Sequence, residues 1–371
     1  MHRDLNLRNH PHGTSPVLGA VSTAIERGSL ERMPKWLICV PLVVQWLWLG
    51  VRYRSFTLPS AANPSITSGG LVGEGKLEYF RDMGPVARAS TARYCAISTH
   101  CRPSRAELRQ MMADAELMFP VVAKPDLGLC GYGVRRIDDL AALQVYLAAF
   151  PADETVVLQA YLAQEGEAGI FYAREPGMGT GRIIGLALRY FPRVTGDGRR
   201  TLDELVAADA RAGRLLGSAQ HECRHAGQRV PAVGEVVRLA TIGSTRVGGL
   251  YRDGGQWITP ALVAAIDAIA RDMPEFHFGR FDVRFDSLPG LAAGRGFTIM
   301  EINGAGSEAI QAWDPGVGLL RGFAMIFAKQ RALFAIGDAM RRRGARPIGL
   351  LALARLNRRQ NLLIGRYPPS N

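Results

Sequence analysis

The sequence predicts an α+β fold, in which short strands and amphipathic helices follow one another and no unit repeats. Strands are indicated where apolar and polar residues alternate, most clearly at residues 281–285 and 297–303. Helices are indicated by two capping boxes, which begin at Ser104 and Thr201. A chain of 371 residues, 47% of them hydrophobic, is long enough to bury a substantial core.

The same signals place the elements in order. Short apolar or alternating runs predict strands, which we expect at residues 119–124, 134–137, 155–159, 168–173, 182–190 and 235–240, and then at 281–285 and 297–303. Cap residues followed by apolar periodicity predict helices, which we expect at residues 104–117, 138–150, 201–211, 259–272 and 319–343. Glycine-rich stretches predict turns at 126–133 and 287–296, and residues 347–371 form a mixed tail.

The charge balance favours anionic partners. The formal net charge is +12, and only four of the 45 basic residues are lysines. The arginines are scattered along the chain and not interleaved with aromatic residues, so we expect no nucleic-acid partner. The five cysteines are odd in number and lack a C-x-x-C spacing, which indicates reduced thiols in a cytoplasmic protein.

Composition divides the chain into four regions. We expect a flexible arm at residues 1–33, an N-terminal region at 34–116, the main α+β domain at 117–330, and a C-terminal helix and tail at 331–371. The oligomeric state stays open.

The N-terminal region contains an apolar run from Trp36 to Val51, broken by Gln45 and flanked by Lys35 and Arg52. The run contains a proline and is short for a membrane span, which takes about 20 residues. Three alternatives stay open: a buried helix, an interfacial helix in peripheral contact with a membrane, and a transmembrane helix.

A long loop rich in Pro, Gly and Ser follows at residues 58–75. Loops of this length are often functional, so Asn63, Glu74 and Lys76 are candidates to line a substrate site. The alternative is a simple connector into the next helix.

The hairpin at residues 279–303 gathers acidic side chains. Alternation places Arg280 and Asp282 on one face of the first strand, and Glu301 and Asn303 on one face of the second, together with Ile299. Carboxylate and amide oxygens suit Mg²⁺, which keeps several waters and bridges to phosphates. The alternative is an ordinary hairpin whose acidic face is solvated.

A second candidate is the strand that ends in Lys124. The loop after it contains Gly128, Gly131 and Gly133, which lets backbone N–H groups approach an anion closely. The alternative is an ordinary β-hairpin turn.

A third candidate follows at residues 159–167. A strand that leads into a short linker, here from Gln159 to Leu162, can offer backbone groups to an adenine edge. The carboxylate of Glu167 suits ribose hydroxyls.

The order of these parts resembles the ATP-grasp superfamily. The resemblance covers about residues 117–320 and is carried by F-P-V-V-A-K-P with its glycine loop, Q-A-Y-L-A-Q-E-G-E, V-T-G-D-G-R-R-T-L-D-E-L, G-E-V-V-R-L, G-G-L-Y-R-D, G-R-F-D-V-R-F-D and I-M-E-I-N-G. The last two are similar to the metal-binding strands of D-alanine–D-alanine ligases, and others look like segments of cyanophycin-synthetase-type ligases. The resemblance implies that residues 117–330 form an ATP-grasp domain, with two α+β subdomains that hold ATP.

The resemblance also implies the residue roles. It implies that Lys124, Gly128, Gly131 and Gly133 bind phosphate. It implies that Gln159 and Leu162 contact adenine, and that Glu167 binds ribose. It implies Asp282, Glu301 and Asn303 as ligands of Mg²⁺ (or Mn²⁺), Arg280 as the group that stabilises the reacting acyl centre, and Arg189 in place of the family's second phosphate lysine.

The implied activity is that of an ATP- and Mg²⁺-dependent ligase. It would join a small-molecule carboxylate, amino-acid or peptide-like, to an amine or a thiol through an acyl phosphate. The alternatives are an ATP-grasp phosphotransferase, a nucleotide-binding protein without ligase activity, and a basic membrane-associated protein that is not an enzyme.

Overall fold

The computed structural model describes residues 27–216 and 227–371. The arm expected at residues 1–33 therefore lies mostly outside the described residues. Its last part contains a short helix, α1, whose Leu30 is buried and whose Glu31 accepts a hydrogen bond from Arg211 at 2.6 Å. Residues 27–33 are thus held against the protein, in contrast to the flexible arm that we expected.

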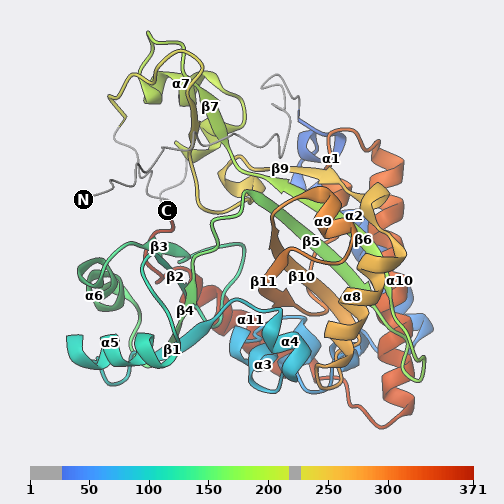
Figure 1. Ribbon diagram of the computed structural model, residues 1–371. Helices are drawn as coiled ribbons and strands as arrows, with labels where there is room; N and C mark the ends of the chain where they lie inside the picture. Colours follow the sequence, from blue (N-terminus) through green and yellow to red (C-terminus); the bar gives the residue numbers. More distant parts are fainter. Residues whose placement is uncertain (1–26, 217–226) are drawn as a thin grey trace, which may run out of the picture.

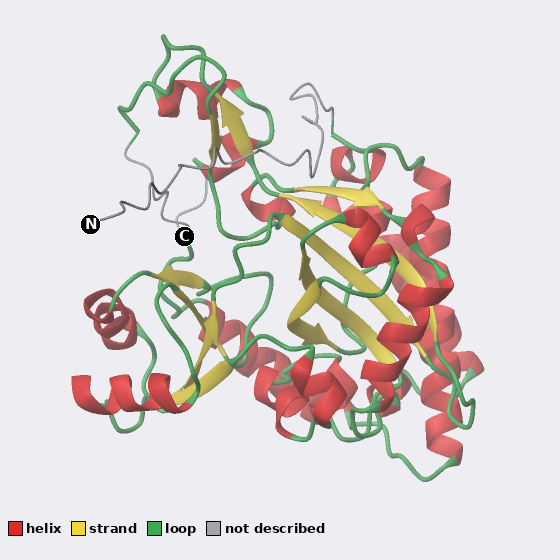
Figure 2. Ribbon diagram, viewed as in Figure 1, coloured by secondary structure: helices red, strands yellow, loops and turns green. Residues whose placement is uncertain are grey.

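Three antiparallel sheets organise the described chain, as Figure 1 and Figure 2 show. Their strand orders are β1-β4-β2-β3, β11-β10-β5-β6-β9 and β7-β8. The strands are β1 (Tyr94–Ser98), β2 (Val121–Pro125), β3 (Arg135–Ile137), β4 (Thr155–Ala160), β5 (Gly166–Ala173), β6 (Arg182–Tyr190), β7 (Arg193–Thr195), β8 (Val236–Arg238), β9 (Leu250–Asp253), β10 (Phe278–Phe285) and β11 (Phe297–Asn303).

Helices cover the sheets, which confirms the α+β class. They are α1 (Ser29–Arg32), α2 (Lys35–Arg52), α3 (Lys76–Arg81), α4 (Pro85–Ala89), α5 (Arg105–Asp114), α6 (Leu140–Ala149), α7 (Leu202–Ala208), α8 (Pro260–Arg271), α9 (Leu288–Ala292), α10 (Leu319–Arg342) and α11 (Leu350–Ile364). The predicted capping boxes are confirmed, since Ser104 caps α5 and Thr201 caps α7 through their side chains. Strands β1, β7 and β9 and helices α1, α4 and α11 were not predicted.

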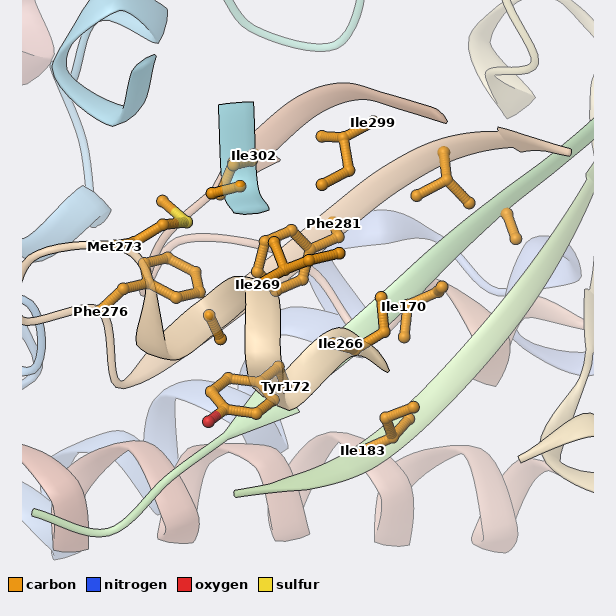
Figure 3. Packing of buried hydrophobic residues seen from close by; sticks show 14 of the residues in the cluster. Ile170, Tyr172, Ile183, Ile266, Ile269, Met273, Phe276, Phe281, Ile299 and Ile302 are labelled. Atoms are coloured by element: carbon orange, nitrogen blue, oxygen red, sulfur yellow. The ribbon is translucent and has the colours of Figure 1, made fainter. Parts of the chain in front are cut away.

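The largest core lies on one face of the five-stranded sheet. Ile170 and Tyr172 of β5 and Phe281 of β10 pack there against Ile266 and Ile269 of α8 (Figure 3). Because side chains alternate along a strand, the residues between these point to the opposite face. The charged residues of β5 and β10 lie on that face.

The four-stranded sheet has the same division. Its outer face, with Val121 and Ala123 of β2, packs against α5 and α6. Its inner face carries Val122 and Lys124, which line a cavity together with residues of β5 and β10. The inner faces of the two larger sheets therefore meet around one cavity.

The hairpin of β10 and β11 has one feature that simple alternation does not predict. Asp282 pairs with Glu301, but the next residue, Val283, pairs with Ile299, so Met300 is an extra residue in a bulge. Ile299 consequently points into the core, whereas Met300 and Glu301 both line the cavity. Our expectation that Ile299 shares a face with Glu301 was wrong for this reason. The connection, expected to be a turn, contains the short helix α9.

The apolar run from Trp36 to Val51 forms helix α2. One face of it packs along α10, with Ile38 near Phe323 and Leu49 near Phe334. Among the described residues, α2 is the one helix whose length and composition would allow it to cross a membrane.

Two predicted boundaries fall inside structural units. Residue 117 separates β1 from β4, although these strands are paired from Tyr94 to Ser98. Residue 331 lies in the middle of α10.

The loop at residues 58–75 folds under the start of β10 through Asn63, which is fully buried. Its side-chain oxygen accepts hydrogen bonds from the N–H groups of His277 and Phe278 at 2.9 and 3.0 Å. Its amide donates to the carbonyls of Gly69 and Phe278 at 2.9 and 2.8 Å. Asn63 is thus a structural residue and not part of the substrate site for which it was a candidate.

We expect Asn63→Ala to destabilise the protein by about 3 kcal/mol, because it leaves several buried backbone groups without a partner. Urea unfolding monitored by circular dichroism measures this loss. Asn357→Ala, at an exposed asparagine of α11, is the matched control and should change the unfolding midpoint little. Equal midpoints for the two variants would contradict the assigned role.

Candidate functional site

The cavity between the two larger sheets has a volume of about 500 Å³. Eleven of the twelve residues to which the resemblance assigns a role line it, and they come from β2, β4, β5, β6, β10, β11 and the loops between them. Gly133 is the exception, since it packs against Pro125 and Tyr367 and its carbonyl accepts a hydrogen bond from Tyr146.

The glycine loop after β2 closes one side of the cavity. Gly131 has φ +75°, a left-handed conformation that favours glycine. At Gly128, a side chain would come within 2.8 Å of the ammonium nitrogen of Lys76. The absence of a side chain at Gly128 therefore leaves room for that cation in the cavity wall.

Lys124 is buried at the base of this loop. Its ammonium donates to Oε1 of Gln159 at 2.7 Å and to the carbonyl of Met300 at 2.8 Å. Burial lowers the pKa of Lys124 to about 8, although the nearby Glu301 acts in the opposite direction. The contact with Met300 also ties the small sheet to the bulge of the large one.

Glu167 lies on the cavity face of β5, held between two guanidinium groups. Its Oε1 is 3.0 Å from NH1 of Arg189, and its Oε2 is 3.4 Å from NH2 of Arg284. Gln159 and Leu162 line the cavity on the other side, before the chain enters β5. Glu167 can accept hydroxyl hydrogen bonds only in addition to these ion pairs or in exchange for one of them.

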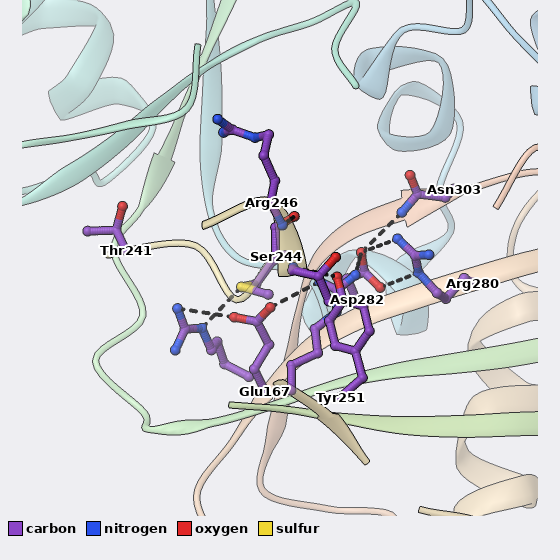
Figure 4. A network of polar contacts seen from close by, with 12 residues as sticks. Glu167, Thr241, Ser244, Arg246, Tyr251, Arg280, Asp282 and Asn303 are labelled. Carbon is purple, nitrogen blue, oxygen red and sulfur yellow. Dashed lines mark hydrogen bonds and ion pairs between the residues drawn. The ribbon is translucent and has the colours of Figure 1, made fainter. Parts of the chain in front are cut away.

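Asp282 is the centre of the polar network in Figure 4. The guanidinium of Arg280 binds both of its oxygens, from Nε at 2.6 Å and from NH2 at 2.8 Å. Oδ2 also accepts from Nδ2 of Asn303 at 3.2 Å and lies 3.4 Å from NH2 of Arg189. Asp282 and Arg280 are both nearly inaccessible to solvent, so the solvated face that was our alternative is excluded for them.

Glu301, opposite Asp282 on β11, is paired with a different cation. Its Oε1 is 3.3 Å from the ammonium of Lys76, which comes from the start of α3. Burial acts to raise the pKa of Glu301, but Lys76, Lys124 and Arg280 outweigh it and hold the pKa below its usual value. The carboxylate is therefore charged at neutral pH.

The donor chemistry of Asp282, Glu301 and Asn303 fits a hard cation such as Mg²⁺. In the part of the chain that the structure describes, no group of three or more His, Cys, Asp and Glu residues could hold a metal. Asp282, Glu301 and Asn303 do not form such a group, because they comprise two carboxylates and one amide. Because Arg280 binds both oxygens of Asp282, a cation that reaches Asp282 must compete with that guanidinium. The three side chains therefore fit a Mg²⁺ site in which the carboxylate of Asp282 is already bound to Arg280.

Several cavity residues were missed or only suggested by the sequence. Tyr251 of β9 faces Arg189, with its ring centre 5.7 Å from the guanidinium carbon. Gln360 of α11 donates to the carbonyl of Gly128 at 3.1 Å and accepts from the N–H of Gly73 at 3.2 Å. Tyr251 lies within G-G-L-Y-R-D, a stretch that contributed to the resemblance but in which no residue was assigned a role. Gln360 lies on a segment without a motif, so only the folded arrangement brings it to the site.

Glu74 is a candidate that the structure places at the cavity. Its Oε2 atom is buried and has no hydrogen-bond partner among residues 27–216 and 227–371. Burial raises the pKa of Glu74 to about 7. A carboxyl group in this state can take up or release a proton near neutral pH.

No model of a known protein family matches the sequence, and no match is found among curated proteins. Solved structures do match. One is a bifunctional glutathione synthetase from Pasteurella multocida, at 14% identity and a TM-score of 0.36, with 70% of this chain and 35% of that chain covered. Another is the ATP-grasp ligase PsnB complexed with a minimal precursor, at 10% identity and a TM-score of 0.36, with 71% of this chain and 59% of that chain covered.

The chain is thus similar in structure to ligases that include an ATP-grasp ligase. The match spans less than two thirds of either protein. At a TM-score of 0.36 the similarity carries no argument about activity. The activity is therefore inferred from the residues of the cavity.

We expect Arg280→Leu to destabilise the protein by about 3 kcal/mol, because it leaves the buried carboxylate of Asp282 without its main partner. The double variant Arg280→Leu/Asp282→Leu should recover part of this loss, and the exposed Arg295→Leu should have little effect. Urea unfolding measures all three. Mg²⁺ should also raise the melting temperature of Arg280→Leu more than that of the wild type, since Asp282 is released. An equal effect of Mg²⁺ on both would contradict competition between the cation and Arg280.

Proposed function

We propose that this protein is an ATP-dependent, Mg²⁺-dependent ligase of the ATP-grasp type, which joins a small-molecule carboxylate to an amine or a thiol through an acyl phosphate. The observation that supports the proposal most is the convergence of the candidate residues on one cavity between two antiparallel sheets. A single strand pair with acidic residues would be weak support, but here the glycine loop, the linker from Gln159 to Leu162 and the hairpin share one cavity.

The charges along the cavity suit phosphoryl transfer, which depends mainly on positioning and on neutralisation of charge. Lys124 and the backbone of the glycine loop would hold the phosphates, and Gln159 and Leu162 would lie against the adenine. Glu167 would hold the ribose. All of these residues line the cavity, so a nucleotide bound there would be within their reach.

The hairpin would supply the reacting end. Asp282, Glu301 and Asn303 would hold Mg²⁺, whose contribution is to neutralise phosphate charge. Arg280, once displaced from Asp282, carries its charge on the cavity side of β10 and can stabilise the oxygen of the reacting acyl group. Arg189, which lies between Glu167 and Asp282, adds a second fixed positive charge beside the phosphates.

Glu74 provides the proton acceptor that an amine nucleophile requires. An ammonium group must lose a proton before it attacks an acyl phosphate, and the carboxylate of Glu74 can receive it. Glu74 lines the cavity together with Lys76 and Glu301. A thiol must also lose its proton before it attacks, so the same acceptor would serve either nucleophile. We propose an amine, and hence a carbon–nitrogen bond, on the basis of the resemblance of the sequence to carboxylate–amine ligases.

The proposal is tested by release of ADP and phosphate from Mg·ATP in the presence of a panel of amino acids and small carboxylates. We expect release that depends on the amine, with loss of at least about 100-fold in Glu301→Ala because phosphate charge is no longer neutralised. Asp286→Ala, at an exposed carboxylate just after β10, is the matched control and should retain activity. ATP binding without turnover on the whole panel would favour a nucleotide-binding protein that is not a ligase, and failure to bind ATP would reject both.

The role of Glu74 has a pH signature. Because burial raises its pKa to about 7, the carboxylate that accepts the proton forms only as pH rises through that value. The turnover number at saturating amine should therefore increase from pH 6 to pH 8, with a midpoint of about 7. Glu74→Gln should remove this increase and lower the turnover number on the order of 100-fold. An unchanged pH profile in Glu74→Gln would reject the assignment while leaving the ligase proposal intact.

A further inference from the structure

Helix α2 presents an exposed face that the cavity does not explain. Nine of its residues between the two ends are exposed, and all of them are apolar. They are Trp36, Leu37, Cys39, Val40, Val43, Val44, Leu47, Trp48 and Val51. Trp36 and Val51, at the two ends, are 69% and 68% exposed, and Val44, in the middle, is 61% exposed. A continuous apolar strip of this kind on a folded protein marks an interaction surface.

The opposite face of α2 fixes how the helix lies. It packs in parallel along α10, from Ile38 near Phe323 to Trp46, whose ring meets that of Phe334 edge-on at 5.0 Å. The side chain of Gln45 is turned inward and donates to the carbonyl of Phe327 at 2.9 Å. A helix held along its whole length by the folded domain lies parallel to the protein surface, so in this arrangement it does not cross a bilayer.

The ends of the strip carry positive charge. Lys35 lies at the first position of α2 and Arg52 at the last, Arg54 follows, and the helix contains no acidic residue. Arg52 also lies over the ring of Trp48, at 5.5 Å from its centre. Tryptophan and basic residues at the borders of an apolar strip are typical of helices that lie in the interface of an anionic membrane.

The composition of the strip favours a lipid surface over a protein partner. Protein interfaces contain about one hydrogen bond per 100–200 Å², which requires donors and acceptors within the contact area. Between Lys35 and Arg52 the exposed side chains of α2 offer only the indole N–H groups of Trp36 and Trp48 and the weak S–H donor of Cys39, and no strong acceptor. The net charge of +12 adds attraction to an anionic leaflet.

We propose that α2 is a peripheral membrane-binding helix, which inserts the strip from Trp36 to Val51 into the interface of an anionic bilayer and lies parallel to its plane. The four described cysteines are free thiols, which suits the cytoplasmic leaflet. This inference is independent of the ligase proposal, because α2 contributes no residue to the cavity lining.

Vesicle flotation with the full chain tests the inference. The wild type should float with vesicles of phosphatidylcholine mixed with phosphatidylglycerol, and much less with phosphatidylcholine alone, with binding weakened by salt. Val44→Glu/Leu47→Glu should reduce flotation at least about tenfold, because it places charge in the middle of the strip. Val145→Glu/Leu351→Glu makes the same substitutions at exposed sites on α6 and α11 and should float like the wild type.

A second measurement on the wild type reports the depth of the helix directly. Of the five tryptophans, only Trp36 and Trp48 are exposed, so phosphatidylcholine with brominated acyl chains, mixed with phosphatidylglycerol, should quench mainly these two. Trp36→Phe/Trp48→Phe should lose the quenching while it still floats. Absence of flotation in the wild type, or undiminished flotation of Val44→Glu/Leu47→Glu, would overturn the inference. A mass of twice 40.3 kDa by light scattering that falls to the monomer in Val44→Glu/Leu47→Glu, without vesicle binding, would assign the strip to a dimer instead.

Discussion

A carboxylate that is almost completely removed from water is stable only when other charges and donors replace its hydration. Asp282 is such a carboxylate, and three side chains take the place of water around it. Its two oxygens receive Arg280, Arg189 and Asn303, all from neighbouring positions on the same sheet face. Arg189 also binds Glu167, and Glu167 binds Arg284. The charged side chains of β10, β5 and β6 therefore form one continuous network of ion pairs. The geometry of the cavity wall depends on this network of ion pairs, because the loss of one charged side chain leaves its partner buried and unpaired.

The second constraint is the meeting of the two larger sheets. Lys124 lies at the end of a strand of the small sheet and donates to Gln159 in its own sheet and to Met300 in the other. Met300 can accept this bond at the cavity because it is the extra residue of the bulge in β11. A departure from regular strand geometry thus places a backbone carbonyl where the lysine needs a partner, while Ile299 and Ile302 stay in the core.

The sequence allowed much of this arrangement to be predicted, for local reasons. Arg280 and Asp282 were placed together because alternation along one strand is a short-range property, and capping at Ser104 and Thr201 depends on residues only three positions apart. The bulge at Met300 was not predictable, since one extra residue in a strand leaves no mark in its composition. Local pattern also could not separate Gly133, which packs against Pro125, from Gly131, which lines the cavity.

Other contributions to the site depend on contacts between distant segments. Gln360 reaches the glycine loop from a helix expected to be part of a mixed tail, and Glu74 owes its raised pKa to burial that only the folded chain provides. For α2, an apolar residue stands at nearly every position, so periodicity did not indicate which side faces the protein. The contacts of Ile38 and Leu49 with residues of α10 or beside it answer that question.

The pairing of α2 with α10 also has a consequence for how the protein is made. Gln45 and its partner Phe327 are separated by 282 residues, so on the ribosome α2 is complete on the order of tens of seconds before α10 exists. During that time both faces of the helix, the one later covered by α10 and the one that stays exposed, present apolar side chains to the surroundings. The nascent chain therefore carries an uncovered apolar segment until α10 emerges, and during that time the segment is accessible to chaperones or to a lipid surface.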